Sequence, residues 1–455
     1  MFNIFEYLHN GSKNARLHFI GIGGVGMYSL ARLALKAGAV VSGSERSESD
    51  LAEELRGRGC KIYIGHSAEN ITPDIDAVVY SHAIGRENPE LSMARDLGIS
   101  TYSRSELLGL VMKQYENRIG ISGTHGKSTV CAMLAHILKT VGLSPTVACG
   151  ASIVGKLPFL DGGEEHFVYE ACEYRDSFLD FYPTSVVITN IELDHTDYFP
   201  TLEEYKGSFL RCINRAEKSC ILNVDDSNIR ALLPLIETEI VTVGTSASAD
   251  FSYSPYSFLA DGIIYSLSRN NKLLGRFKLK LAGEFNLMNA ALAIAAAEDV
   301  GIDPKEAAEA LASFKGVKRR CEFVGTYGSR AVYYDYAHHP TEIRAVINAL
   351  RARSGAITVI FTPHTYSRTR DLWDDFISAL SLADFVILTD IFAAREEPVP
   401  NITSKRLAEA IGDRAFYSDV QSISGILNTY TYGDIVVMGA GENTEILSLL
   451  VSKNG

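Results

Sequence analysis

The amino-acid sequence predicts an α/β protein of three domains, each built on a largely parallel sheet that is covered by helices. Three observations support this prediction. Short strand-like apolar stretches alternate with segments of helical apolar spacing, and glycine-rich turns follow two of the expected strands. The chain also has 455 residues, and domains usually run to about 100 to 200 residues, so three domains is the natural expectation.

We expect the domains to span residues 1–112, 113–316 and 317–455. In open α/β sheets ligands bind beyond the carboxyl ends of the strands, so we expect the ligand-binding residues in the loops that follow strands. The expected strands are the apolar stretches at residues 16–20, 39–45, 76–83, 118–122, 166–173, 185–195, 219–226, 356–364, 384–392 and 434–443.

Composition limits the class of partner. Hydrophobic residues make up 46% of the chain and charged residues 22%, which is enough apolar material for several ordinary cores. The formal net charge of -12 argues against a general binder of nucleic acid or of anionic membranes, because those partners attract clustered Lys and Arg. An anionic ligand must therefore be held by groups in its own binding site rather than by the overall charge of the protein. The sequence does not indicate an oligomeric state.

Cysteine usage and the N-terminus predict a soluble cytoplasmic protein. The seven cysteines are scattered singly without C-x-x-C spacing, which fits reduced thiols better than a disulfide framework or a zinc site. The N-terminus has no basic segment followed by a long apolar run, and the apolar stretch "ALAIAAAEDV" is too short to span a bilayer.

The first glycine signature is "GIGGVG", with Gly21, Gly23 and Gly26 in G-x-G-x-x-G spacing between an expected strand and an expected helix. Glycines there allow a tight turn and the close approach of a pyrophosphate to the helix N-terminus, and Glu45 suits a ribose hydroxyl. The motif predicts a Rossmann-like domain that binds a diphosphate and a ribose. A nicotinamide dinucleotide and a nucleotide diphosphate sugar both offer these groups, and a purely structural glycine turn is the simpler alternative.

The second signature is "ISGTHGKST", which resembles a phosphate-binding loop except that Ile121 stands at the usual first glycine. Gly123 and Gly126 let backbone N–H groups turn toward an anion, Lys127 adds a positive charge, and the Ser128 hydroxyl suits Mg2+. The following helix would direct its positive N-terminal end at the phosphates. We therefore expect a central P-loop ATPase domain, against the alternative of a glycine turn with a surface lysine.

Further metal ligands are expected at the ends of neighbouring strands, because Mg2+ prefers oxygen ligands and retains water. Glu170 ends one expected strand, and His195 lies just past another, where it could reach a second cation or its bound water. Alone, either would be an ordinary loop residue. Beside a phosphate loop, both are candidate ligands.

Two polar loops follow strands of the third domain. "VYYDYAHHPTE" carries His338 and His339, and "FTPHTYSRTRDLW" carries Arg368 and Arg370. Arginine suits a carboxylate or phosphate because it forms two parallel hydrogen bonds. Any one such loop is best explained as solvated surface, but two in one domain favour a ligand site.

Taken in order, the motifs are similar to those of the Mur ligase family, and most similar to its L-alanine-adding members. The matching stretches run from His18 to Asn443 and include "HFIGIGGVGM", "GTHGKST", "EACEYRDSF", "NIELDH", "GEFNLMNA", "GVKRRCE", "DYAHHPTEI", "PHTYSRTRD" and "MGAGEN". The resemblance implies a UDP-sugar domain, a central ATPase domain and a C-terminal α/β ligase domain. The family's loop, G-T-x-G-K-[ST], needs no glycine at Ile121.

The resemblance also implies roles for individual residues. The implied ATP contacts are Gly123, Thr124, His125, Gly126, Lys127, Ser128, Thr129, Asn289, Arg320 and Asp335. The implied metal ligands are Ser128, Glu170 and His195. The implied UDP-sugar contacts are Gly21, Gly23, Gly24, Gly26, Ser44, His66 and Ser81. The implied catalytic residues are Lys127, Glu170, His195, His338 and Arg368, the last two lying where the amino acid and the muramyl carboxylate meet.

The implied reaction is the ATP- and Mg2+-dependent joining of L-alanine to the lactyl carboxylate of UDP-N-acetylmuramate, in peptidoglycan biosynthesis. The carboxylate would attack the γ-phosphorus to give an acyl phosphate and ADP, and the amine would then displace phosphate. Cations in the site would offset the repulsion between the two anions of the first step.

Three alternatives stay open. A recycling ligase, which attaches murein tripeptide to the same UDP-sugar, has a similar "AHHPT" loop. An NAD-dependent oxidoreductase with a regulatory ATP site would use the first glycine signature but would leave the catalytic metal carboxylate unexplained. A non-catalytic nucleotide sensor would leave the filled acid, histidine and arginine positions unexplained.

Overall fold

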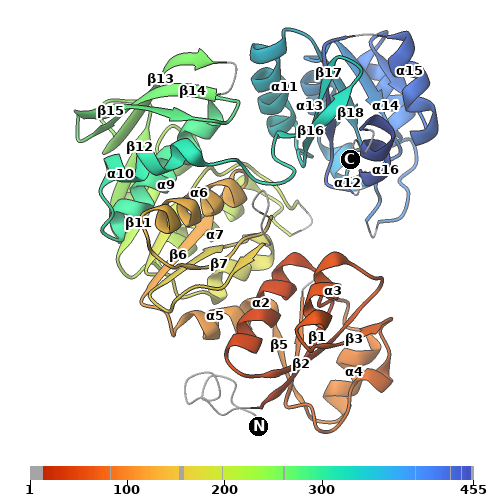
Figure 1. Cartoon of the computed structure of the whole chain (residues 1–455). Helices are drawn as coiled ribbons and strands as arrows, with labels where there is room; N and C mark the ends of the chain where they lie inside the picture. The colour runs from red at the N-terminus through yellow and green to blue at the C-terminus, as the bar shows by residue number, and fades with distance from the viewer. Residues whose placement is uncertain are drawn as a thin grey trace. The chain divides into compact units, whose positions relative to one another are not determined.

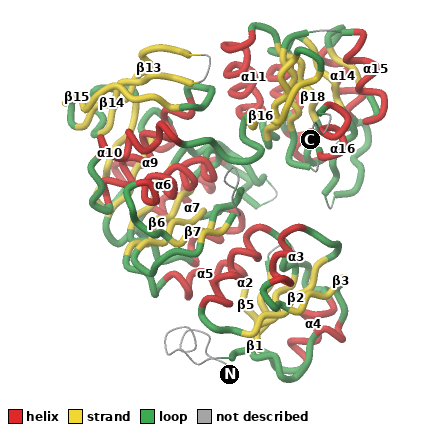
Figure 2. The backbone as a smooth tube through the Cα atoms, viewed as in Figure 1, coloured by secondary structure: helices red, strands yellow, loops and turns green. Residues whose placement is uncertain are grey.

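Helices and strands alternate along the computed structural model, as the sequence predicts (Figures 1 and 2). Within the described residues they form one sheet of five strands, one of ten and one of six, so the predicted α/β class is confirmed. No helix in these ranges has both the length and the apolar character needed to cross a membrane. The structure describes residues 14–81, 84–152, 158–196, 198–259, 262–394, 396–430, 432–441 and 443–451.

The first sheet has the Rossmann-like topology that the first glycine signature predicts. Its elements are β1 (Arg16–Ile20), α2 (Val25–Lys36), β2 (Val40–Glu45), α3 (Asp50–Gly57), β3 (Lys61–Ile64), β4 (Ala77–Tyr80), α4 (Pro89–Asp96), β5 (Ser100–Ser103) and α5 (Arg104–Met112). The strands are parallel in the order β3-β2-β1-β4-β5. Successive strands are added on one side of β1 up to β3 and on its other side from β4 onward, and open sheets bind ligands at such a reversal of strand order, here between β1 and β4. Leu17 and Phe19 face the helix layer of α2, α3 and α5, whereas Ile20 and Val78 face α4.

The second sheet has β6 between β10 and β9, and it pairs in parallel with both. Its strand order is β15-β14-β13-β12-β11-β10-β6-β9-β7-β8, and β12 to β15 extend it beyond the expected strands. The elements are β6 (Asn117–Ser122), α6 (Lys127–Thr140), β7 (Thr146–Ala148), β8 (Phe159–Leu160), β9 (His166–Glu170), β10 (Ser185–Ile188), α7 (Leu202–Ile213), β11 (Ser219–Asn223), α8 (Ser227–Leu232), β12 (Glu239–Gly244), β13 (Phe251–Leu259), β14 (Gly262–Arg269), β15 (Lys272–Leu279), α9 (Phe285–Asp299) and α10 (Pro304–Ala310).

The third sheet runs β16-β17-β21-β18-β19-β20, parallel except for the β16–β17 pair. Its elements are β16 (Glu322–Tyr327), β17 (Arg330–Asp335), α11 (Pro340–Ser354), β18 (Ile357–Phe361), α12 (Tyr366–Asp371), α13 (Trp373–Leu380), β19 (Phe385–Leu388), α14 (Ser404–Ile411), β20 (Ala415–Tyr417), α15 (Ile423–Thr429), β21 (Asp434–Met438) and α16 (Thr444–Leu450). Helices α11, α13 and α14 pack on one face, and α15 and α16 on the other. Short 3-10 helices elsewhere are η1 (Ala68–Asn70), η2 (Tyr174–Asp180), η3 (Leu233–Leu235), η4 (Leu311–Ser313) and η5 (Val420–Ser422).

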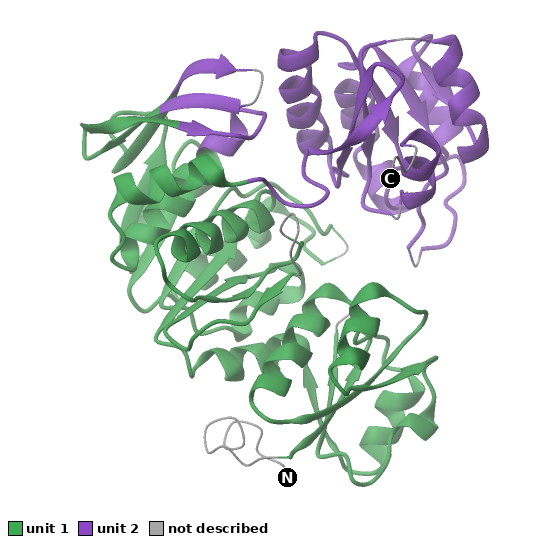
Figure 3. Ribbon diagram, in the orientation of Figure 1, with its two compact units in different colours: residues 1–254, 266–277, 288–314 green, residues 255–265, 278–287, 315–455 purple. Residues whose placement is uncertain are grey.

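The chain divides into two compact units, which Figure 3 distinguishes by colour. The first unit contains residues 1–254, 266–277 and 288–314, and the second contains residues 255–265, 278–287 and 315–455. The first two sheets therefore belong largely to one unit, and the third sheet belongs to the other.

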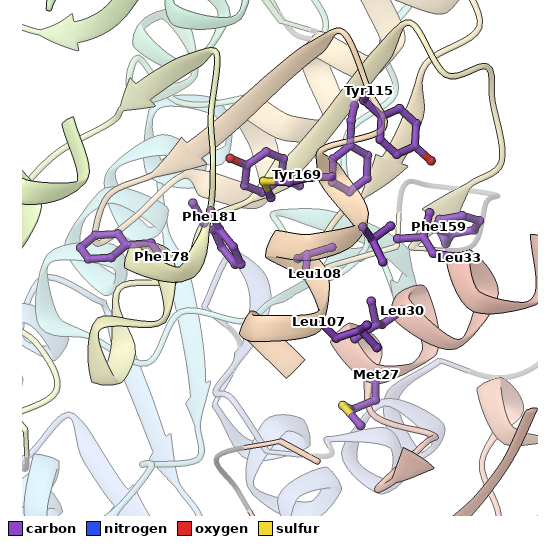
Figure 4. Close-up of a cluster of buried hydrophobic side chains, with 14 of the residues drawn as sticks. Met27, Leu30, Leu33, Leu107, Leu108, Tyr115, Phe159, Tyr169, Phe178 and Phe181 are labelled. Atoms are coloured by element: carbon purple, nitrogen blue, oxygen red, sulfur yellow. The ribbon is translucent and has the colours of Figure 1, made fainter. Parts of the chain in front are cut away.

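A continuous apolar cluster joins the first two sheets inside the first unit. Figure 4 shows Met27 and Leu30 of α2 beside Leu107 of α5, and the same buried cluster extends to Phe159 of β8 and Tyr169 of β9. Each of these side chains is almost inaccessible to solvent. Each Å2 of apolar surface that is removed from water stabilises the fold by about 25 cal/mol. The two sheets therefore stabilise one another.

Candidate active site

The loop between β6 and α6 has the form of an anion-binding turn. Gly123 has φ 129° and Gly126 has φ 86°, conformations that favour glycine. A Cβ on Gly123 would lie 2.0 Å from the hydroxyl oxygen of Thr189, and one on Gly126 would lie 2.8 Å from Oδ1 of Asn289. Neither position has room for a side chain, and the expected ATP contact Asn289 lies directly beside the loop. Helix α6 begins at Lys127, so its positive end adjoins the same turn.

Ile121 occupies the position of the missing glycine because that position belongs to a strand. It is fully buried, it pairs in register with Glu170 of β9, and its carbonyl accepts a hydrogen bond from Ala171 N at 2.9 Å. The turn begins only at Gly123, so a glycine at 121 would remove core packing without helping the loop.

Residues just after β10 hold the loop in place, and the sequence reasoning did not assign them. Asn190 accepts a hydrogen bond from His125 N at 2.9 Å and donates one to His125 O at 3.0 Å, and Thr189 donates to the same carbonyl at 2.6 Å. The Thr124 hydroxyl donates to Glu192 O at 2.9 Å. Their position directly after a buried strand was the available signal.

A buried carboxylate that the sequence analysis did not assign holds Lys127. Its Nζ lies 3.1 and 3.2 Å from the two carboxylate oxygens of Glu173, whose side chain is 1% exposed, and it donates to the carbonyls of Gly123 and Thr124. Burial is the largest influence on the pKa of Lys127 and lowers it, but neighbouring groups, Glu173 foremost, together outweigh that effect and raise it. Burial likewise raises the pKa of Glu173, but Lys127 and His195, together with a backbone hydrogen bond, hold it below its ordinary value. The two groups therefore form a buried ion pair at neutral pH.

Glu173 also binds His195, the expected second metal residue. His195 Nε2 lies 3.5 Å from Glu173 Oε1, and the Tyr205 hydroxyl donates to that oxygen at 3.3 Å. His195 has a left-handed φ of 55°, and its backbone N–H donates to the Asp194 carboxylate at 2.7 Å. The structure thus brings Lys127 and His195 to one carboxylate.

Glu170 and Ser128 are linked through one cysteine. Glu170 Oε1 accepts hydrogen bonds from Gly150 N at 2.5 Å and from Cys149 Sγ at 3.3 Å, and the same sulfur lies 3.6 Å from the Ser128 carbonyl oxygen, an alternative acceptor for its one proton. Ser128 and its neighbour Thr129 lie in the first turn of α6 and are each 7% exposed. A carboxylate and a hydroxyl are oxygen ligands of the kind that Mg2+ prefers, so these residues fit the expected ion.

A cavity of about 320 Å3 in the first unit joins the first glycine loop to Glu170. This volume lies within the usual range of small-molecule sites, about 300 to 1,000 Å3. Arg104, at the start of α5, is the only basic residue among the described residues of its lining, and the sequence reasoning did not assign it. The lining residues include Gly21, Gly24, Gly26, Ser81, Arg104, Cys149, Gly150, Glu170 and Cys172.

The first glycine loop is held by the carboxylate of Glu45, and the helix that follows it has no side-chain N-cap. Glu45, expected near a ribose, accepts a hydrogen bond from Gly23 N at 2.9 Å. Gly24 caps α2 without a side-chain hydrogen bond, and a Cβ on Gly26 would lie 3.1 Å from Arg104 Cδ. The loop therefore presents a helix N-terminus and a guanidinium to the cavity, a combination that suits an anion.

Ser44 and His66, both expected to contact the UDP-sugar, have different roles. Ser44 is completely buried: its hydroxyl donates to Glu90 Oε2 at 2.5 Å and lies 2.9 Å from His66 Nδ1, while its carbonyl accepts from Gly21 N at 2.8 Å. Its hydroxyl and carbonyl are enclosed in this structure, where Ser44 supports the loop and His66; a direct ligand contact by Ser44 stays a prediction. The side chain of His66 is 13% exposed and stays a candidate contact.

In the second unit, His338 and Arg368, both expected site residues, each lie beside His364, which the sequence reasoning did not assign. His338 Nδ1 lies 2.9 Å from Tyr336 O, and the His338 ring is 5.9 Å from the His364 ring, centroid to centroid. Arg368 Nη1 lies 3.2 Å from His364 Nδ1. His364 is the histidine of "PHTYSRTRD", the loop that follows β18, so its position after a strand could have revealed it.

Asp335 and Arg320 lie near the same end of the third sheet. Asp335 is 3% exposed and accepts hydrogen bonds from the backbone N–H groups of Cys321 at 2.6 Å and Ala337 at 2.7 Å. Burial raises the pKa of Asp335 to about 6. Arg320 lies over the Tyr336 ring and 3.3 Å from a Glu342 oxygen. Asp335, expected at a ribose, therefore directs both oxygens to the backbone in this structure.

Family comparisons cover each of the three sheets. Residues 16–116 match the model described as "Mur ligase family, catalytic domain", residues 121–297 match "Mur ligase middle domain", and residues 319–441 match "Mur ligase, glutamate ligase domain". The chain is 39% identical over 448 residues to the UDP-N-acetylmuramate--L-alanine ligase of Caldicellulosiruptor bescii, covering 96% of this chain and 98% of that one. The enzyme of the same name from Acetivibrio thermocellus is 40% identical over 446 residues, covering 95% and 94%.

Solved structures agree with this assignment. The UDP-N-acetylmuramate-alanine ligase of Thermotoga maritima matches with a TM-score of 0.81 and 27% identity, covering 96% of this chain and 98% of that one. A murein peptide ligase of Psychrobacter arcticus has the same fold, with a TM-score of 0.72, 24% identity and coverage of 97% and 100%. On these matches across nearly its whole length, this chain belongs to the Mur ligase family.

Proposed function

We propose that the chain is an ATP-dependent ligase that joins L-alanine to the lactyl carboxylate of UDP-N-acetylmuramate in peptidoglycan synthesis, with release of ADP and phosphate. The cavity that joins the first glycine loop to Glu170 carries this proposal. It connects a diphosphate loop to a phosphoryl-transfer site, which suits phosphorylation of a carboxylate on the nucleotide sugar itself. The names of relatives at 39% and 40% identity specify L-alanine as the acceptor.

The reaction has two balanced steps. A lactyl carboxylate oxygen attacks the γ-phosphorus of ATP, the bond to the ADP oxygen breaks, and an acyl phosphate forms. The neutral amine of L-alanine then attacks the acyl carbon, phosphate leaves, and the amine proton passes to a base. In the first step the lactyl carboxylate approaches the negatively charged γ-phosphate. Lys127 and the N-terminal end of α6 offset the repulsion between these two anions.

Ser128 and Glu170 would hold Mg2+, which supplies charge neutralisation at the phosphates when bound. Glu170 is fixed for this task because Gly150 N and the Cys149 thiol both donate to its Oε1. His195 is held by Glu173, and it would be a ligand of the second cation that the family resemblance implies.

We assign His338 and Arg368 to the amino-acid end of the reaction. The Tyr336 carbonyl can only accept a hydrogen bond, so His338 Nδ1 carries the proton and Nε2 keeps the lone pair. A neutral imidazole of this tautomer can take up the amine proton. Arg368 provides a guanidinium of the kind that pairs with carboxylates.

We propose that the reaction takes place in the cytoplasm. All seven cysteines are free thiols in the structure, which is their usual state in a reducing compartment. Titration of protein denatured directly from cells should detect seven reactive thiols, and disulfides would argue for an oxidising compartment.

ADP release by the purified chain tests the proposal. The assay contains ATP, Mg2+ and UDP-N-acetylmuramate and compares L-alanine, glycine, L-serine and murein tripeptide as acceptors, with UDP-N-acetylglucosamine as a control that lacks the lactyl carboxylate. Fastest turnover with L-alanine and the matching mass increase of the nucleotide sugar are expected. A preference for the tripeptide would establish the recycling reaction instead, and no turnover with any acceptor would refute a ligase.

A further inference from the structure

A completely buried carboxylate lies at the centre of the first sheet's polar network, and the function described above does not use it. Glu90, in the first turn of α4, has 0% of its side chain exposed. Ser44 and Asn70 donate hydrogen bonds to it at 2.5 and 2.6 Å, His66 Nδ1 lies 3.2 Å away, and His18 Nε2 lies 3.5 Å away. Four polar side chains therefore converge on one acid.

These partners connect Glu90 to the carboxyl ends of three adjacent parallel strands. Ser44 lies in β2, and its carbonyl accepts from Gly21 N and Ile22 N in the loop after β1, at 2.8 and 3.1 Å. His66 follows β3, and Asn70 donates to Gly65 O at 3.2 Å. Glu90 thus supports both the first glycine loop and the segment that carries His66.

The donors around Glu90 determine the tautomer of His66. Burial raises the pKa of Glu90, but the His18 ring 3.5 Å away and the hydrogen bonds from Ser44 and Asn70 together outweigh that effect, so its pKa is below its ordinary value and it is ionised at neutral pH. An ionised carboxylate only accepts hydrogen bonds, and the Ser44 proton is already donated to it. His66 Nδ1, which faces both oxygens, must therefore carry the proton that it shares with them.

We propose that Glu90 is a positioning residue for nucleotide-sugar binding: it holds His66 as the Nδ1–H tautomer, so that Nε2 accepts a hydrogen bond from a donor on UDP-N-acetylmuramate. Among the described residues none hydrogen-bonds Nε2, and the partly exposed ring leaves that nitrogen for a ligand. The inference rests on the proposed function, since it names that function's nucleotide sugar as the ligand.

Glu90→Gln and Ser44→Ala, each in the full chain, test this role. Glu90→Gln removes the negative charge and exchanges one acceptor oxygen for an NH2 group, so His66 loses the ionised acceptor that fixes its tautomer. Ser44→Ala removes only the hydroxyl between the two residues. Glu69→Gln, an exposed acid in η1 whose carboxylate has no hydrogen bond among the described residues, is the matched control. The measurements are the Kd of UDP-N-acetylmuramate and of UDP by calorimetry, the KM of each substrate, and kcat.

The expected result for Glu90→Gln is a rise of about tenfold in the Kd of both nucleotides, the value of about one hydrogen bond. The KM of ATP and of L-alanine and the response of Glu69→Gln should stay at the wild-type values. Ser44→Ala should move the same Kd in the same direction, which keeps the test valid if Glu90→Gln fails to fold.

A direct readout of the tautomer separates positioning from a merely structural role. In 1H–15N spectra of histidine-labelled protein, the His66 signal, assigned with His66→Gln, should show protonated Nδ1 in the wild type and lose that signature in Glu90→Gln. Unchanged nucleotide affinity, an equal rise of all three KM values, or an unaltered His66 tautomer would each overturn the inference. Wild-type protein that binds UDP without ligating would refute the proposed function but would still leave the UDP Kd values to decide the role of Glu90.

Discussion

Replacement of Lys127 by Ala should remove both catalysis and a buried counter-charge. Lys127 Nζ lies 3.1 Å from Glu173, whose side chain is only 1% exposed. Removal of one partner from a buried pair costs about 3 to 5 kcal/mol, because the other charge is left without compensation. With a urea slope of about 3 kcal/mol/M, that loss lowers the unfolding midpoint by about 1 M or more. ADP release should be abolished, whereas UDP-N-acetylmuramate binding should be retained because the glycine loop proposed to bind it belongs to a different sheet.

The double variant Lys127→Ala, Glu173→Gln shows whether the isolated charge is the cause. An amide at position 173 carries no charge, so the urea midpoint should largely recover while ADP release stays absent. Lys139→Ala, an exposed lysine in the last turn of the same helix, should change neither property. If the single and double variants unfold at the same urea concentration, the ion-pair reasoning is refuted; loss of UDP-N-acetylmuramate binding would refute the division of labour between the two glycine loops.

Three further predictions follow from single side chains. Gly123→Ala should raise the KM of ATP about tenfold or more, because its Cβ would lie 2.0 Å from the Thr189 hydroxyl oxygen, whereas Gly142→Ala, also at positive φ but in open space, should leave that KM unchanged. Glu170→Gln should raise the Mg2+ concentration for half-maximal turnover about tenfold or more, and an unaltered Mg2+ titration would remove Glu170 from the metal site. Asp335 has a pKa raised to about 6, so between its unfolded and folded pKa values the folded chain binds a proton that the unfolded chain has lost. Wild-type stability should therefore fall relative to Asp335→Asn by about 3 kcal/mol as pH rises from about 3 to about 7; parallel stability curves would contradict this.

Local patterns were sufficient to predict the fold class and the loops. Gly21 and Gly126 each stand between a strand and a helix, and both adopt the positive φ that makes glycine necessary. Glu170 ends its strand as expected, since strand alternation and an abrupt polar residue can be read within a few positions. These features depend on neighbours in the chain, which is why the residues alone reveal them.

The supporting carboxylates could not be predicted in that way. Glu173 lies within "EACEYRDSF", but its role depends on Lys127, which comes 46 residues earlier, at the start of α6. Glu90 looks like an ordinary acid in the first turn of a helix, where a negative charge is favourable in any case. Ser44 resembles a ligand contact because it ends a strand beside a glycine loop, yet its hydroxyl turns inward to Glu90. Each role depends on packing between segments far apart in the sequence.

The pairing of Ile121 with Glu170 has a consequence for the entropy of nucleotide binding. The strand that leads into the proposed phosphate loop and the strand that ends at Glu170, the proposed metal ligand, are adjacent in one sheet, so thermal motion cannot separate them without breaking backbone hydrogen bonds. Binding then has to order side chains only, at about 0.5 to 1.5 kcal/mol for each one immobilised. Ile121 would thus contribute to affinity without touching the nucleotide, because its packing limits the thermal motion of the proposed phosphate loop relative to Glu170, the proposed metal ligand.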